Sequence, residues 1–187
     1  MRRSKYKRQE TGSGDSQLRI PPTPEQARQR TFQRAIKLLA AKSRSVAELR
    51  ELLLERRGAT KTIVEEIIAR LREYGYLDDE RFAFGYASLR LRQRPIGRQR
   101  LKRDLALKKV DQAVADEALD LVFEEVSEEE LIDRAIEKRI RLRGRPKNRL
   151  EAKSLFDHLM RQGFPFELVA DKVRRTAETT LEPDDTT

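Results

Sequence analysis

Apolar residues recur three and four positions apart over most of this chain, which is the spacing of an amphipathic α-helix. Three such stripes open the periodic region: Phe32, Ile36 and Leu39, then Val46, Leu49, Leu53 and Leu54, then Ile63, Val64, Ile67, Ile68 and Leu71. Ser45 is expected to cap the second helix and Thr60 or Thr62 the third, and Gly58 is expected to end the second. The pattern predicts three short helices over residues 29–81.

The same three-helix plan returns twice more along the chain. The second copy, over residues 82–127, contains RFAFGYASLRLR, GRQRLKRDLALKKV and DQAVADEALDLVFEEV, and the third, over 128–177, contains EEELIDRAIEKRIRLR, NRLEAKSLFDHLMRQGF and PFELVADKVRRTAE. Gly58, Lys109 and Gly163 occupy matching positions. Units of about 50 residues bury their apolar faces better when they stack end to end. The sequence therefore predicts an all-α fold, an elongated, curved array of three tandem three-helix, helix-turn-helix-like repeats.

The stretch YGYLDDERFA predicts a rigid corner between the first two units. Gly75 can adopt the left-handed conformation that ends a helix, and Asp78 can accept hydrogen bonds from the first amides of the next helix. Asp79 favours the positive helix end, and Leu77 and Phe82 fall at the positions of a hydrophobic staple. Together with Tyr76, these residues are expected to set the angle between the units, or simply to stabilise the fold.

The two ends of the chain lack this periodicity. Residues 1–28 are polar and contain GSG and PPTP, so we predict a disordered basic arm, and residues 178–187 predict a disordered acidic tail.

Composition narrows the class of protein further. Only 37% of the 187 residues are hydrophobic and 39% are charged, which favours thin helical units over a thick enzyme core. The absence of cysteine excludes disulfides and thiol chemistry, and no apolar run is long enough for a membrane span or an export signal, so we expect a cytoplasmic protein. The net charge of +9 favours polyanionic partners.

Charge is distributed in blocks. Nine basic residues face one acid between Arg90 and Lys109, and nine face two acids between Arg134 and Lys153, whereas Asp116 to Glu130 holds eight acids and no base. Such blocks are often only solvated helix faces. The two basic blocks nevertheless recur at matching places in the repeat, next to Pro95 and Gly97 and next to Gly144 and Pro146.

Arginine dominates both basic blocks, and its planar guanidinium suits bidentate contact with phosphate or carboxylate. The predicted contacts to nucleic acid or to an acidic protein surface are Arg90, Arg92, Arg94, Arg98, Arg100, Lys102, Arg103, Arg139, Arg141, Arg143, Arg145, Lys147 and Arg149. Few aromatic residues accompany them, so backbone-tracking electrostatics is favoured over base stacking.

No catalytic constellation is visible in the sequence. The glycines form no phosphate-binding loop, and the acids of FEEVSEEE splay around a helix instead of converging on a reacting atom or metal. The single histidine, His158, lies beside leucines and is expected to be a partly buried helix residue. We therefore expect a protein that binds, without catalytic residues, metal or cofactor.

Several segments resemble the RecX family, the regulators of the RecA recombinase. These are AIKLLAAKSRSVAELRELLLERRG, IVEEIIARLREYGYLDDERFA, RLRQRPIGRQRLKRDLALKKV with ADEAL, and LFDHLMRQGFPFELV, within residues 32–176. The segment GYLDDERFA is the most specific of them.

The resemblance implies a protein that lies along the groove of the RecA filament on single-stranded DNA and suppresses ATP hydrolysis, strand exchange and co-protease function. We expect a monomer, because the sequence shows no long heptad seam and no large second apolar face. A rival interpretation is a sequence-nonspecific duplex or single-stranded DNA-binding protein, because three-helix units with basic corners are also typical of such modules.

Overall fold

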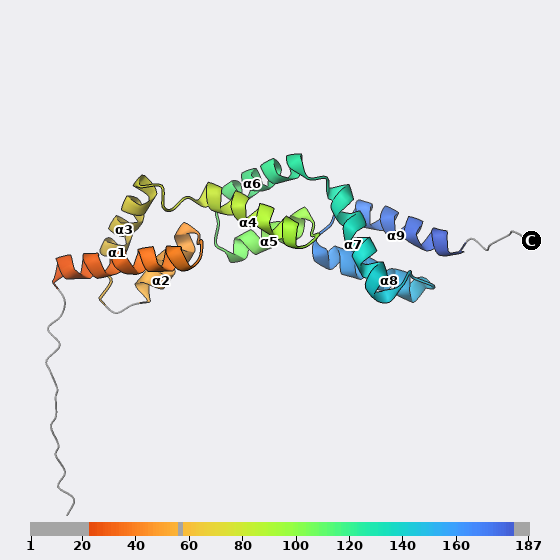
Figure 1. The fold of residues 1–187 in the computed structure, drawn as a ribbon, viewed down its shortest axis with the longest axis horizontal. Helices are drawn as coiled ribbons and strands as arrows, with labels where there is room; N and C mark the ends of the chain where they lie inside the picture. Colours follow the sequence, from red (N-terminus) through yellow and green to blue (C-terminus); the bar gives the residue numbers. More distant parts are fainter. Residues whose placement is uncertain (1–22, 56–57, 182–187) are drawn as a thin grey trace, which may run out of the picture.

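The computed structural model describes residues 23–55 and 58–181. Within these ranges the chain forms nine α-helices and no strand: α1 (Pro24–Ala41), α2 (Val46–Leu54), α3 (Lys61–Glu73), α4 (Asp79–Gln93), α5 (Arg98–Leu107), α6 (Gln112–Glu125), α7 (Glu128–Arg143), α8 (Arg149–Gln162) and α9 (Phe166–Leu181). The helices group in chain order into unit 1 (α1–α3), unit 2 (α4–α6) and unit 3 (α7–α9). The three units follow one another in an elongated, curved row (Figure 1). The predicted all-α, three-unit fold class is confirmed.

The unit boundaries differ from the predicted ones by a few residues. The predicted disordered arm ends too late, because Thr23 caps α1 through a capping box with Gln26, Pro24 occupies its first turn and Ala27 is buried. The structure likewise begins unit 2 at Asp79 and extends α9 to Leu181, into the predicted tail. The predictions for residues 1–22 and 182–187 lie outside the described residues.

The apolar stripe predicted for the first helix packs only in part, since Phe32 and Leu39 are half-buried against the core of unit 1. Helix α1 buries the small residues Ala27, Thr31 and Ala35, whereas Ile36 is 36% exposed. Small side chains let α1 approach α2 and α3 closely. Helix α3, in contrast, buries its whole predicted stripe of Ile63, Val64, Ile67, Ile68 and Leu71.

The corner between α3 and α4 has both of its predicted caps. Gly75 takes a φ of +69°, and the amides of Gly75 and Tyr76 donate to the carbonyl oxygens of Arg72 and Leu71, each at 2.9 Å. One carboxylate oxygen of Asp78 accepts from the amides of Glu80 (2.9 Å) and Arg81 (3.1 Å). A backbone turn and a side-chain cap thus fix the chain direction within a few residues.

Two separate apolar cores run along the row. Leu77 belongs to the core of unit 1, whereas Phe82 belongs to a second core that continues from unit 2 through unit 3. The predicted staple between these two residues is therefore not supported. Units 2 and 3 share one interior, and unit 1 has an interior of its own.

Polar contacts join unit 1 to unit 2. The buried Ser45 hydroxyl donates to the carbonyl oxygen of Lys108 (2.5 Å), and the Lys108 ammonium pairs with Glu48 (2.9 Å). A carboxylate oxygen of Asp79 accepts from the amide of Val46 (2.8 Å), and Lys109 pairs with Glu51. This set of contacts is called the polar seam below.

The three residues that matched in the sequence repeat share a backbone conformation. Gly58, Lys109 and Gly163 have φ angles of +93°, +59° and +86°, so each lies in the left-handed region near the end of the second helix of its unit. Lys109 is the only non-glycine residue with a positive φ within the described ranges. The shared geometry supports a true repeat.

Candidate polyanion-binding surface

The basic residues predicted for unit 2 lie on α4, on α5 and, for Arg94, just after the end of α4, and an internal carboxylate engages two of them. Asp104 on α5 is only 7% exposed, and it accepts from Arg90 Nη2 and Arg100 Nε, each at 3.1 Å. A buried carboxylate without such partners would be strongly destabilising. Arg90 therefore joins α4 to α5 through Asp104, and Arg100 pairs with the same carboxylate from within α5.

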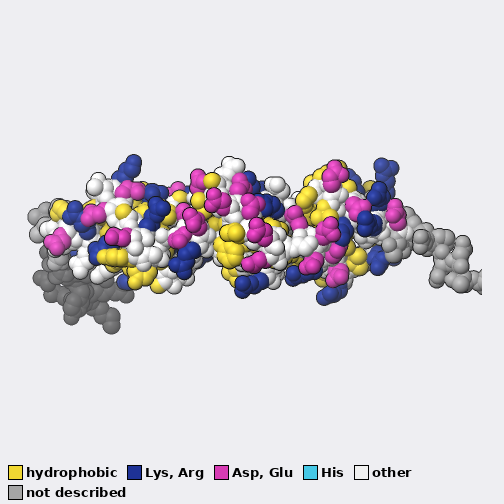
Figure 2. Space-filling view, turned by 90° about the horizontal axis from the view of Figure 1, so that it is seen from above, with side chains coloured by type: hydrophobic (Ala, Val, Ile, Leu, Met, Phe, Trp, Pro, Cys, Tyr) yellow, Lys and Arg dark blue, Asp and Glu magenta, His cyan; other side chains and the backbone are white. Residues whose placement is uncertain are grey.

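The acidic block of α6 engages two more of the predicted residues. Arg98 Nη2 lies 2.5 Å from Asp120, with its guanidinium over the Phe123 ring at 5.9 Å. Lys102 Nζ lies 2.6 Å from Asp116, and this hydrogen bond lowers the pKa of the Asp116 carboxyl. The acidic and basic blocks of unit 2 thus neutralise one another in part. Figure 2 shows the result, with charges of both signs interspersed over all three units.

The other three predicted contact residues of unit 2 have no such partner. Within the described residues, Arg92, Arg94 and Arg103 form no ion pair or side-chain hydrogen bond. They are the members of this block that are available to an external anion.

Unit 3 presents its basic residues differently. Arg139 donates to Ser154 Oγ at 3.3 Å, and among the described residues the side chains of Arg141, Arg143, Arg145, Lys147 and Arg149 have no hydrogen-bond or ion-pair partner. All five are exposed. We call them, with Arg139, the unit 3 basic corner.

Backbone geometry explains why these basic residues lie close together in unit 3. Helix α7 ends at Gly144, whose φ is +77°, and α8 begins only at Arg149, capped by Asn148. The acid in the first turn of α8, Glu151, is engaged by the Lys147 amide (2.8 Å) and the Asn148 side chain (3.2 Å). A hollow of about 250 Å³ lies between Arg139, Arg143 and Ser154. The corner therefore concentrates guanidinium groups at one tight chain reversal, an arrangement suited to phosphate oxygens.

The described residues contain no group of three or more His, Cys, Asp or Glu side chains placed to hold a metal ion. His158 is half-buried on α8, and burial together with Arg139 and Arg161 lowers its pKa. Across the same residues, no helix is both long and apolar enough to cross a membrane.

Comparisons with solved structures identify the fold. A crystal structure of RecX from Lactobacillus salivarius superposes with a TM-score of 0.70 and 19% identity, over 82% of this chain and 97% of that one. A second crystal structure, of a regulatory protein RecX, gives a TM-score of 0.69 at 20% identity, over 81% of this chain and 73% of that one. The fold is thus the all-helical fold of these regulatory proteins.

Sequence comparison gives the family. The sequence model of the protein family described as RecX, second three-helix domain, matches residues 78–119. The regulatory protein RecX of Chlorobium limicola is 33% identical over 146 residues, which are 78% of this chain and 88% of that protein. That of Treponema pallidum is 41% identical over 110 residues, 59% of this chain and 66% of that protein. The chain belongs to the RecX family of regulatory proteins.

Some relatives are longer than the region that matches. The match covers 57% of the Bacillus licheniformis protein and just under two thirds of the Treponema pallidum protein.

Proposed function

We propose that this chain binds the RecA filament formed on single-stranded DNA and lies along the filament groove across neighbouring RecA protomers. Binding there lowers the ATPase, strand-exchange and co-protease activities of the filament. The chain needs no chemistry of its own for this role, because an elongated body that bridges successive subunits can block filament extension or weaken the contact between protomers.

The observation that carries the proposal is the unit 3 basic corner at one end of an elongated, three-unit body. Its exposed arginines, together with Arg92, Arg94 and Arg103 of unit 2, form the contacts to the DNA backbone or to acidic filament surface. The predicted contacts Arg90, Arg98, Arg100 and Lys102 act instead within unit 2, where carboxylates already engage them. The corner at Gly75 and Asp78 sets the angle of unit 1 against this surface.

A titration of RecA ATPase activity on single-stranded DNA tests the proposal. The protein is added at a salt concentration high enough to weaken its binding to bare DNA. We expect the ATPase rate to fall at less than one molecule of this protein per RecA protomer, because one bound regulator affects neighbouring subunits.

The rival function is plain DNA binding, which the exposed unit 3 basic corner would also serve. An unchanged ATPase rate, together with firm binding to duplex DNA without RecA, would replace the filament proposal with that function. Affinity for DNA alone would then fall steeply with added salt.

A further inference from the structure

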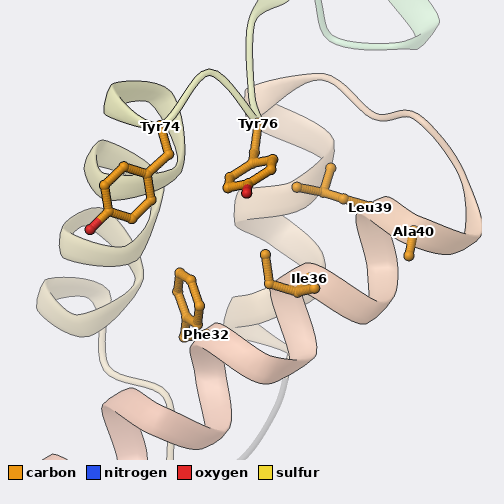
Figure 3. A pocket seen from close by; sticks show the side chains of 6 residues that line it. All are labelled: Phe32, Ile36, Leu39, Ala40, Tyr74 and Tyr76. Carbon is orange, nitrogen blue, oxygen red and sulfur yellow. The ribbon is translucent and has the colours of Figure 1, made fainter.

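Unit 1 carries an apolar groove on its surface. Six residues line a hollow of about 840 Å³: Phe32, Ile36, Leu39 and Ala40 of α1, and Tyr74 and Tyr76 of the corner (Figure 3). Tyr74 is 51% exposed and Tyr76 is 64% exposed. Phe32 and Leu39 also pack against the edge of the unit 1 core, whereas Ile36, Tyr74 and Tyr76 are exposed. A hollow of this size lies within the usual range of ligand and peptide sites.

The aromatic wall of the groove is held in place before any partner arrives. The Arg70 guanidinium lies over the Phe32 ring at 5.1 Å and over the Tyr74 ring at 5.3 Å, and its Nε donates to the Tyr74 hydroxyl at 3.1 Å. Tyr76 meets Tyr74 edge to face with 6.4 Å between ring centroids, and the turn at Gly75 fixes both backbones. A preformed wall lowers the entropic cost of binding.

Positive charge lies at one end of the groove. A second hollow shares Leu39 and Tyr76 with the first and is also lined by Arg44 and Arg81. The one acid in this lining, Asp78, is engaged by the first amides of α4. The Arg44 Nε is buried without a hydrogen-bond acceptor within the described residues. Neither Arg44 nor Arg81 forms an ion pair within the described residues, so their positive charge at this end of the groove is not neutralised.

We propose that this groove binds an amphipathic helix of a partner protein, one that presents an aliphatic stripe flanked by carboxylates. The stripe would fill the hollow over Ile36 and Leu39, and the carboxylates would pair with Arg44 and Arg81. This inference goes beyond the proposed function, because it requires neither DNA nor the unit 3 basic corner.

Charge and shape disfavour the other occupants of the groove. Residues 1–22 of the chain itself contain six basic side chains against Glu10 and Asp15, so they match the arginine end poorly. A single nucleic-acid strand would find stacking partners in the aromatic wall alone, since Ile36, Leu39 and Ala40 offer no ring.

The test uses a fluorescein-labelled, glutamate-rich peptide with leucines at positions i, i+3, i+4 and i+7, and fluorescence anisotropy with the full chain. One control peptide scrambles the leucine stripe, and another replaces every glutamate with lysine. We expect the glutamate peptide to bind at least about tenfold more tightly than either control. Replacing Ile36→Gln should weaken its binding at least about fivefold, whereas the matched exposed change Leu121→Gln on α6 should not.

Circular dichroism confirms that both variants keep their helix content, so a loss of binding by the Ile36→Gln chain reports the groove. Equal affinity for the lysine peptide would overturn the proposal, as would binding that Ile36→Gln leaves unchanged. If deleting residues 1–22 makes the groove accept the peptides regardless of charge, the chain's own arm is the occupant. If the chain forms a dimer that Ile36→Gln dissociates, the occupant is a second copy, and this result also replaces the proposed helix.

Discussion

Gly97 and Gly163 meet backbone to backbone where unit 2 joins unit 3. The Gly97 amide donates to the carbonyl oxygen of Gln162 at 3.0 Å, and the Gln99 amide donates to the carbonyl oxygen of Gly163 at 3.1 Å. A Cβ atom on Gly97 would lie 2.4 Å from the Gly163 oxygen. The start of α5 therefore touches the end of α8 without any side chain between them.

Replacing Gly97→Ala should destabilise the protein by about 2–3 kcal/mol, because backbone atoms must move to make room for the methyl group. The free energy of unfolding from urea titration measures the effect. Gly85→Ala is the matched control, because Gly85 lies inside α4 with open space around it. This replacement should stabilise the protein by about 0.5–1 kcal/mol. Similar values for the two variants would contradict the close contact.

The left-handed conformation of Lys109 makes a second prediction. The chain with Lys109→Gly should be more stable than the chain with Lys109→Ala by about 1 kcal/mol, because only the glycine relieves the steric cost of a positive φ. Both variants lose the pairing with Glu51, so their difference isolates the backbone contribution. Equal stability in urea unfolding would show that Lys109 has no strain to relieve.

The polar seam should make the angle between units 1 and 2 sensitive to salt. The chain has no cysteine, so spin labels can be placed at exposed sites through Arg72→Cys with Leu121→Cys across the seam, and through Leu121→Cys with Leu142→Cys across the junction of units 2 and 3. Raising the salt concentration to about 1 M should broaden the distance distribution across the seam, because ions screen Lys108 from Glu48 and Lys109 from Glu51.

The second pair of labels is the control for this measurement. Its distance distribution should stay narrow at both salt concentrations, because an apolar core crosses that junction. Equal broadening for both pairs would mean that the seam is no softer than the apolar junction.

His158 should make stability depend on pH in the weakly acidic range. Burial and the nearby Arg139 and Arg161 lower the pKa of His158 below its ordinary value of 6.5. As the pH falls through that value, the unfolded chain binds a proton that the folded chain resists, so the free energy of unfolding decreases. Urea titrations at about pH 7.5 and pH 5.5 should show a larger decrease for the natural chain than for His158→Gln. An identical decrease would contradict this assignment.

The unit 3 basic corner should dominate the salt dependence of binding to single-stranded DNA. Replacing Arg141→Gln together with Arg143→Gln should reduce the slope of log K against log salt by about 1.4, if each guanidinium neutralises one phosphate. The matched change of Arg98→Gln with Lys102→Gln should leave the slope nearly unchanged and lower stability, because Asp120 and Asp116 already engage those cations. The opposite ranking would assign DNA contact to unit 2.

Local signals in the sequence were sufficient to predict the corner between α3 and α4 and the three-unit repeat. The turn at Gly75 and the cap at Asp78 depend on residues within one or two helical turns, and Gly163 ends α8 by the same means. Periodicity located α1 as a helix but did not identify its most deeply buried residues, because the small Ala27 and Ala35 pack inward while the larger Ile36 faces the groove. The sizes of the side chains along one helix do not show how closely the neighbouring helices approach it.

The sequence predicted which basic residues could form the candidate surface, but not which of them are engaged by carboxylates in the folded chain. Asp104 lies four residues after Arg100, so their pairing was within reach of the sequence. The contact of Arg98 with Asp120 depends on how α5 packs against α6, and no local pattern reports that packing. The exposed and the engaged arginines therefore look alike in sequence and differ only in the folded chain.

The apolar core is divided in two near Asp78, and this division affects the order in which the chain unfolds. Unit 1 buries its own cluster and is tied to unit 2 by hydrogen bonds and ion pairs, so its unfolding leaves the shared interior of units 2 and 3 closed. Such a chain has two cooperative blocks, and the smaller one opens at the lower free energy. Amide protons of α3 should then exchange with deuterated water earlier than those of α6. A protease that recognises extended chain would make its first cut before residue 79.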